Sequence, residues 1–169
     1  VVVEDATELR PDHPHVVGLE ARPANVEGAG QVTVRDLVKQ ALRMRPDRLV
    51  VGEVRGAEVV DLLAALNTGH EGGCGTVHAN SPADVPARFE ALGVAAGLPR
   101  EAVHSQLAAG IEVVVHVGRP ADGRRAVEQL AVVRRVDGGA AVACTPATTF
   151  VDGRAVRGPG WSRLLEVIG

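Results

Sequence analysis

The chain has 169 residues, enough for one domain with a real hydrophobic core. Hydrophobic residues make up 46% of the chain but aromatic residues only 2%, so the core must be built mainly from Val, Leu, Ile and Ala, a mixture typical of buried parallel strands covered by helices. The formal net charge of -3 excludes a broadly basic surface, and we expect no specific nucleic-acid binding.

Cysteine content and hydropathy indicate where the protein resides. Cys74 and Cys144 are the only cysteines, so the sequence has no disulfide framework and favours a reducing cytosol. No apolar run approaches the roughly 20 residues that a membrane-spanning helix needs. We therefore expect a cytoplasmic protein.

The first half of the chain alternates predicted strands and helices. The apolar run at residues 1–3 predicts a buried strand, and the lack of a Met or polar lead-in before it indicates a cut through a larger fold. Thr33 caps a predicted helix that Pro46 stops. The other elements are a loop at 8–29 with an extended segment at 15–20, a strand at 49–53, a helix at 57–66, a glycine-rich loop at 70–75 and a strand at 76–79.

The second half begins with helices and ends with hairpins. Ser81 caps a predicted helix with Pro82 at its first position, and this helix runs to Gly93. The following elements are a helix at 100–109, strands at 111–117, 126–136, 140–144 and 148–151, a turn at 137–139 and a helix at 161–168. This order predicts an α/β sheet with an antiparallel extension.

Two glutamates follow apolar strands, Glu4 after the first and Glu53 after the second. In open α/β sheets ligands bind at the carboxyl ends of the strands, where two carboxylates could hold a hydrated magnesium ion or activate a water. Each glutamate alone is equally well explained as the first polar residue of a loop.

Three arginines, Arg43, Arg45 and Arg48, precede the second strand in a chain that is not basic overall. A guanidinium group suits bidentate contact with phosphate, within one subunit or across a subunit boundary. The alternative is a solvated helix end, where positive charge favours the helix dipole.

The spacing of His70, Cys74 and His78 raises the alternative of a zinc site. The glycines between them argue against a single helix face that carries all three, and no fourth ligand is evident. A glycine-rich turn that lets backbone amides and a histidine approach a phosphate is the favoured interpretation.

Three segments, taken together in order and spacing, resemble the type II/type IV secretion ATPase family, closest to its Tad-pilus and conjugal-transfer branch. They are Glu4-Asp5 with Glu8-Leu9, residues 42–56, and residues 68–81. The resemblance covers roughly residues 1–120 and implies an α/β fold there, an incomplete RecA-like P-loop NTPase sheet with flanking helices. The strand and turn pattern of residues 121–169 predicts a separate, antiparallel and β-hairpin-rich extension.

The resemblance also implies roles for acidic and histidine residues. Glu4 lies in the family's Asp box and would activate the attacking water. Glu53 ends an atypical Walker B strand, in which Gly52 stands where many ATPases have aspartate, and would serve magnesium through water as well as the attacking water. His78, in the His box, would sense the γ-phosphate, with His70 as a second candidate.

The resemblance assigns nucleotide contacts to arginines as well. Arg43 would contact phosphate, while Arg10, Arg22 and Arg45 are weaker candidates for that role or for a neighbouring subunit's site. The implied cofactors are ATP and Mg²⁺, and the implied assembly is a homo-hexamer that works with inner-membrane pilus or secretion platform proteins. Such a hexamer would lie at the inner face of the cytoplasmic membrane and drive pilus assembly or secretion by ATP hydrolysis.

The phosphate-binding loop that such an ATPase needs does not occur in this sequence. No G-x-x-x-x-G-K-S/T motif is present, and Lys39 is the only lysine. We expect negligible ATP affinity and no activity for this chain alone, with the loop upstream in a larger protein. The alternative functions are a non-catalytic assembly or interaction module and a small zinc-binding domain.

Overall fold

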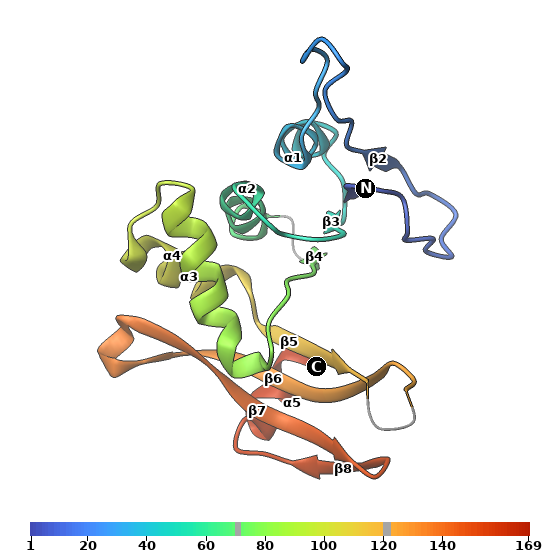
Figure 1. Ribbon diagram of the computed structural model, residues 1–169. Coiled ribbons are helices and arrows are strands. Elements are labelled where there is room, and N and C mark those ends of the chain that lie inside the picture. Colours follow the sequence, from blue (N-terminus) through green and yellow to red (C-terminus); the bar gives the residue numbers. More distant parts are fainter. Residues whose placement is uncertain (70–71, 120–122) are drawn as a thin grey trace. The chain divides into compact units, whose positions relative to one another are not determined.

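The computed structural model describes residues 1–69, 72–119 and 123–169 (Figure 1). The chain forms two compact units, which we describe separately. The first contains Val1–Val77 and Leu92–Leu98, and the second contains His78–Ala91 and Pro99–Gly169. The division at residue 120 that the resemblance implies follows sequence motifs and stays a prediction.

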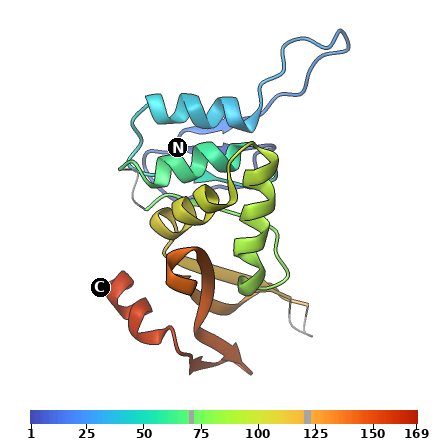
Figure 2. The ribbon, with the colours of Figure 1, turned by 90° about the vertical axis from the view of Figure 1, so that its left-hand side faces the viewer.

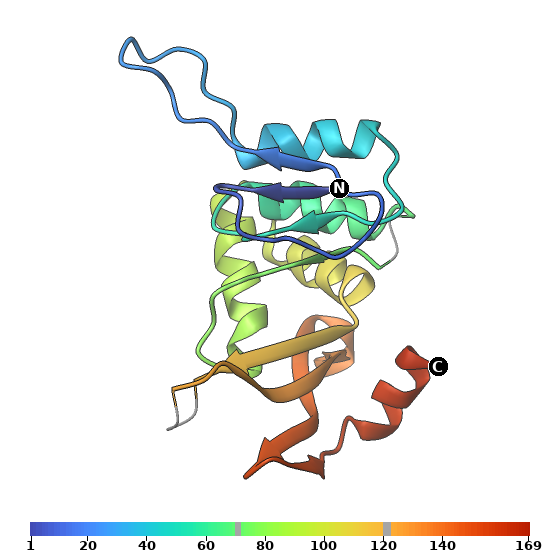
Figure 3. The same ribbon diagram turned by 90° about the vertical axis from the view of Figure 1, so that its right-hand side faces the viewer.

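The first unit is built on a parallel sheet of four short strands. Their order is β2 (Gly18–Glu20), β1 (Val2–Glu4), β3 (Val50–Val51) and β4 (Cys74–Gly75). All three neighbouring pairs are parallel, so the carboxyl ends of the strands share one edge, as the arrows of Figure 3 show. The valines of β1 and Val51 of β3 are buried, as expected for a parallel sheet.

The predicted strand at 76–79 is wrong in position, because β4 lies earlier, at Cys74–Gly75. The register pairs Val50 with Cys74 and Val51 with Gly75. A Cβ atom at Gly75 would lie 3.1 Å from Leu62 Cδ2, so the missing side chain lets β4 approach the helix that contains Leu62.

Two helices of the first unit pack side by side. Helix α1 (Val34–Arg43) begins with the predicted cap: the Thr33 hydroxyl accepts a hydrogen bond from the Asp36 N–H, and the Asp36 carboxylate accepts one from the Thr33 N–H. The hydroxyl of Thr33 also donates to that carboxylate, and these bonds lower the pKa of Asp36. Helix α2 (Glu58–Leu66) is tied to α1 by a 2.7 Å ion pair between Arg35 and Asp61.

A loop projects from the end of β2 as an arm, between Arg22 and Val32 (Figure 2). These two residues form an antiparallel bridge at its base. Inside the arm, the Asn25 side chain accepts hydrogen bonds from the backbone N–H groups of Glu27 and Ala29, at 3.1 and 2.8 Å. The predicted loop at 8–29 therefore has internal order over its last third.

The second unit combines helices with an antiparallel sheet. Its helical part is η1 (Pro82–Asp84), most of α3 (Val85–Ala95) and α4 (Arg100–Gly110). The sheet has the order β5 (Val113–Gly118), β6 (Ala126–Val136), β7 (Ala141–Val151) and β8 (Arg154–Arg157), with η2 (Asp137–Gly139) between β6 and β7, and α5 (Trp161–Ile168) follows it. The predicted antiparallel extension is confirmed.

Strand β7 corrects the prediction of two separate strands at 140–144 and 148–151. It continues through Pro146, which pairs with Ala131, while the next residue along β6, Leu130, pairs with Thr148. Ala147 is thus an extra residue, and this bulge accommodates the proline without ending the strand.

A small cluster stabilises the second unit. Its buried members are Val132, Ala147 and Leu164, and the partly buried side chains packed against it are Val113, Leu130 and Trp161. Leu164 and its neighbour Leu165 lie on the same helix, with 3% and 47% of their surface exposed. The cluster therefore depends on one face of α5.

We predict that Leu164→Ala lowers the free energy of unfolding by about 2–4 kcal/mol, because it leaves a cavity in this cluster. The matched control, Leu165→Ala, should change it by no more than about 0.5 kcal/mol. Urea denaturation of both variants measures the difference. Equal losses would show that α5 does not pack as described.

Candidate active site

Glu4 and Glu53 lie at the same edge of the parallel sheet. Strand β1 pairs with β3 in the register Val3 with Val51, and the Gly52 N–H donates to the Val3 carbonyl at 2.8 Å. Glu4 is the last residue of β1, and Glu53 comes two residues after the end of β3. Glu4 is 7% exposed, and the side chain of Glu53 is 20% exposed. The structure therefore brings these two predicted site residues together at the ligand-binding edge of the sheet.

The carboxylate of Glu4 is held by the loop that follows it. Its Oε1 atom accepts hydrogen bonds from the backbone N–H groups of Glu8, at 3.1 Å, and Leu9, at 3.0 Å. A buried carboxylate needs such partners. Glu4 therefore both shapes the loop and keeps a fixed position.

Arg55 is a site residue that the sequence analysis missed. Its Nη2 atom lies 2.5 Å from Oε2 of Glu53, and its Nη1 atom lies 3.8 Å from Oδ2 of Asp5. The hydrogen bond to Glu53 raises the pKa of Arg55. The signal was available, because Arg55 follows Glu53 by two residues and falls inside the family motif.

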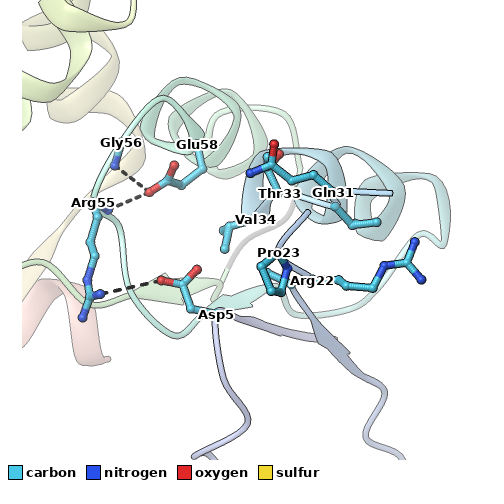
Figure 4. Close-up of a pocket in the computed structure, with 11 residues that line it drawn as sticks. Asp5, Arg22, Pro23, Gln31, Thr33, Val34, Arg55, Gly56 and Glu58 are labelled. Atoms are coloured by element: carbon cyan, nitrogen blue, oxygen red, sulfur yellow. Dashed lines mark hydrogen bonds and ion pairs between the residues drawn. The ribbon is translucent and has the colours of Figure 1, made fainter. Parts of the chain in front are cut away.

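A pocket of about 420 Å³ opens beside these residues (Figure 4). Side chains of both charge signs line this pocket: Asp5 and Glu58 are acidic, and Arg22 and Arg55 are basic. At the start of α2, Oε1 of Glu58 accepts hydrogen bonds from the backbone N–H groups of Arg55 and Gly56, at 2.6 and 2.7 Å. Backbone N–H groups at the start of a helix can bind an anion, and here the carboxylate of Glu58 is the anion that accepts their hydrogen bonds.

The predicted arginines fall in different places. Arg22 lines the pocket, and its Nε atom donates to the Gly30 carbonyl at 2.9 Å. Arg43 is the last residue of α1, and Arg45 lies between α1 and β3. Figure 3 shows that α1 ends on the side of the sheet where β3 begins, opposite to the carboxyl ends of the strands. The side chains of Arg43 and Arg45 form no ion pair and no hydrogen bond with any residue that the structure describes. Arg10 is exposed in the loop between β1 and β2.

His78 does not share a unit with the two glutamates. His78 is exposed and is the first residue of the second unit, and His70 lies outside the described residues. Cys74 is exposed in β4. Within residues 1–69, 72–119 and 123–169, no group of three or more His, Cys, Asp or Glu side chains could hold a metal ion.

Comparison with known proteins identifies the family. The family described as Type II/IV secretion system protein matches residues 1–156, and the chain belongs to it. A Mycobacterium tuberculosis protein named for conjugal transfer is 70% identical over 138 residues, which are 82% of this chain and 39% of that protein. The type IV secretion system protein VirB11 of Brucella suis is 34% identical over 126 residues, 69% of this chain and 34% of VirB11.

Solved structures support the same assignment. The crystal structure of the VirB11 ATPase from Brucella suis, in complex with sulphate, matches with a TM-score of 0.65 and 30% identity, over 78% of this chain and 39% of that one. The X-ray structure of the Legionella pneumophila ATPase DotB matches with a TM-score of 0.52 and 22% identity, over 78% of this chain and 36% of DotB. At this identity the match supports the fold and nothing further. The predicted partial RecA-like α/β fold is confirmed. The chain spans about two fifths of the length of the first curated relatives it matches.

The two strand-end glutamates fit the magnesium ion that an ATPase of this fold implies. Magnesium in nucleotide sites keeps several waters and is bound through one or two carboxylates plus the substrate phosphates. Glu4 and Glu53 offer two carboxylates at the carboxyl ends of neighbouring strands, where ligands bind in open α/β sheets. No helix in the described residues has both the length and the apolarity of a membrane crossing.

We predict that Glu4→Ala speeds hydrogen exchange of the Glu8 and Leu9 amides by about tenfold or more, because both lose their acceptor. Glu4→Gln should have a smaller effect, since its side-chain oxygen can still accept both bonds. The Ala21 amide, which donates to the main-chain carbonyl of Glu4, is the internal control. Mass spectrometry of the exchanged protein measures all three. Unchanged exchange in Glu4→Ala would contradict the described loop.

Proposed function

We propose that this chain is part of an ATP hydrolase that powers pilus assembly, conjugal transfer or secretion through a type II or type IV machine. The observation that carries the proposal is the pair Glu4 and Glu53 at the ends of adjacent parallel strands, in a chain of this family. The similarity to the VirB11 ATPase supports it. The proposed cofactors are ATP and Mg²⁺.

The chemistry follows from where charge lies at the sheet edge. Magnesium, when bound, would neutralise charge on the β- and γ-phosphates. Glu4 and Glu53 supply the carboxylates that orient the metal's water shell and activate an attacking water. Arg55 pairs with Glu53, and an arriving phosphate would compete for its guanidinium group. Nucleotide binding would thereby release Glu53 for chemistry.

The phosphate cradle must come from elsewhere in the protein. This sequence has no G-x-x-x-x-G-K-S/T loop, and without that loop's amides and lysine the phosphates of ATP lose most of their contacts. We place the cradle in the part of the relatives' length that this chain does not span. Residues 1–169 alone should therefore bind ATP negligibly.

The position of Arg43 and Arg45 favours a role between subunits. Helix α1 ends at Arg43, on the side of the sheet opposite to the carboxyl ends of the strands, so we assign neither arginine to the site that Glu4 serves within one chain (Figure 3). In a ring with head-to-tail contacts, one side of each subunit meets the opposite side of the next subunit. We propose a homo-hexamer in which Arg43 stabilises phosphate charge in the neighbouring site.

His78 is the proposed γ-phosphate sensor. Its support is the His box of residues 68–81 and its place as the first residue of the second unit. The proposed partners are inner-membrane platform proteins, met at the cytoplasmic face of the membrane.

We predict that Glu53→Gln in the full-length protein lowers ATP turnover by at least about 100-fold, because it removes a carboxylate from the reacting site. Binding of a fluorescent ADP analogue should persist. The control is Glu27→Gln, an exposed residue of the arm. Equal ATP turnover in the wild-type protein, Glu53→Gln and Glu27→Gln, or no turnover in any of them, would instead support a non-catalytic interaction module.

We predict that co-expressed Arg43→Ala and Glu53→Gln subunits, each inactive alone, form mixed rings with about a quarter of the wild-type turnover. In such rings an intact Glu53 meets an intact Arg43 from its neighbour at one interface in about four. Separately tagged subunits and tandem purification isolate the mixed rings. Turnover that stays at the level of the single variants would place Arg43 in its own subunit's site or outside any site.

A further inference from the structure

The turn between β3 and helix α2 is held by a side chain that follows it in the sequence. Oε1 of Glu58 accepts hydrogen bonds from the backbone N–H groups of Arg55, at 2.6 Å, and Gly56, at 2.7 Å (Figure 4). Hydrogen bonds to a carboxylate are shorter and about twice as strong as those between neutral groups. Glu58 therefore fixes the backbone of the turn from which the Arg55 side chain leaves.

These two bonds do not cap helix α2. A cap accepts hydrogen bonds from the first N–H groups of the helix itself, which have no partner inside it. Helix α2 begins at Glu58, and the residue before it, Ala57, makes no side-chain capping bond. The two donors to Glu58 lie before the helix. The bonds of Glu58 therefore determine the geometry of the turn.

The side chain of Arg55 depends on this turn for its direction. It is 63% exposed, so packing does not hold it in place. Its guanidinium group nevertheless reaches two acids, Glu53 beyond the end of β3, at 2.5 Å, and Asp5 beyond the end of β1, at 3.8 Å. Ordering a long, exposed side chain costs conformational entropy, and a fixed backbone lowers that cost. The hold on the turn therefore favours the place that Arg55 takes at the strand ends.

We propose that Glu58 is a positioning residue of the site: by holding the turn, it aims the guanidinium group of Arg55 at the ends of β1 and β3. There Arg55 pairs with Glu53 and, when nucleotide binds, contacts a phosphate group. Glu58 itself touches neither nucleotide nor metal and acts only through Arg55. This inference rests on the proposed ATPase function.

The hold on the turn is tested by hydrogen exchange in the full-length protein. Glu58→Ala should speed exchange of the Arg55 and Gly56 amides by about tenfold or more, because both lose their acceptor. Glu58→Gln should have a smaller effect, since its side-chain oxygen can still accept both bonds. The Gly52 amide, which donates to the Val3 carbonyl, is the internal control. Unchanged exchange of the Arg55 and Gly56 amides in Glu58→Ala would overturn the hold.

The positioning role is tested by a double-mutant cycle in ATP turnover. Glu58→Ala and Arg55→Ala should each raise the KM for ATP by about fivefold or more, with a smaller change in kcat, because a phosphate contact is lost. The double variant should be no worse than Arg55→Ala alone, since Glu58 acts through Arg55. Glu58→Gln should keep a KM near that of the wild-type protein.

The matched control is Asp61→Ala, an acid of the same helix that pairs with Arg35 at 2.7 Å. It should lower stability without raising the KM. Losses of Glu58→Ala and Arg55→Ala that multiply in the double variant would overturn the positioning role, and so would an equal rise of the KM in Asp61→Ala.

The two tests separate this inference from the proposed function. A wild-type protein without ATP turnover would refute the ATPase function, and the contact of Arg55 with phosphate would fall with it. The amide exchange judges the hold of Glu58 on the turn in either case.

Discussion

The parallel pairing of β1 with β3 is the constraint on which the rest of the first unit depends. It places Val3 beside Val51, buries both strands, and delivers Glu4 and Glu53 to one edge of the sheet. Because each strand is only two or three residues long, a shift of one residue would turn the carboxylates away from that edge. The burial of Val3 and Val51 on this short sheet therefore fixes both the fold and the site.

Local signals made the helices and strand β6 predictable. The Thr33 cap and the spacing of apolar residues fixed α1, and the predicted bounds of β6 and α5 agree with the structure. Strands β4 and β7 were misplaced or split, because contacts distant in sequence decide them. Strand β8 was missed, although it pairs with β7 across a short turn. The close approach of Gly75 to α2 sets β4, and the bulge opposite Ala131 carries β7 past Pro146.

The candidate site was likewise predictable from the sequence only in part. Glu4 and Glu53 were predictable, since an acid after an apolar strand marks the edge at which ligands bind. The ion pairs of Arg55 were not, because they join segments about 50 residues apart in the chain or depend on side-chain direction. The position of Arg43 at the opposite edge follows from the direction in which α1 runs.

We propose that Glu4 and Glu53 form the catalytic edge of a nucleotide site. The most direct test is an experimental structure of the full-length protein with magnesium and a non-hydrolysable ATP analogue. In that structure we expect both carboxylates to face the metal's waters and the γ-phosphate. We also expect the ion pair between Arg55 and Glu53 to be broken. A bound nucleotide remote from both glutamates, with that ion pair intact, would contradict it.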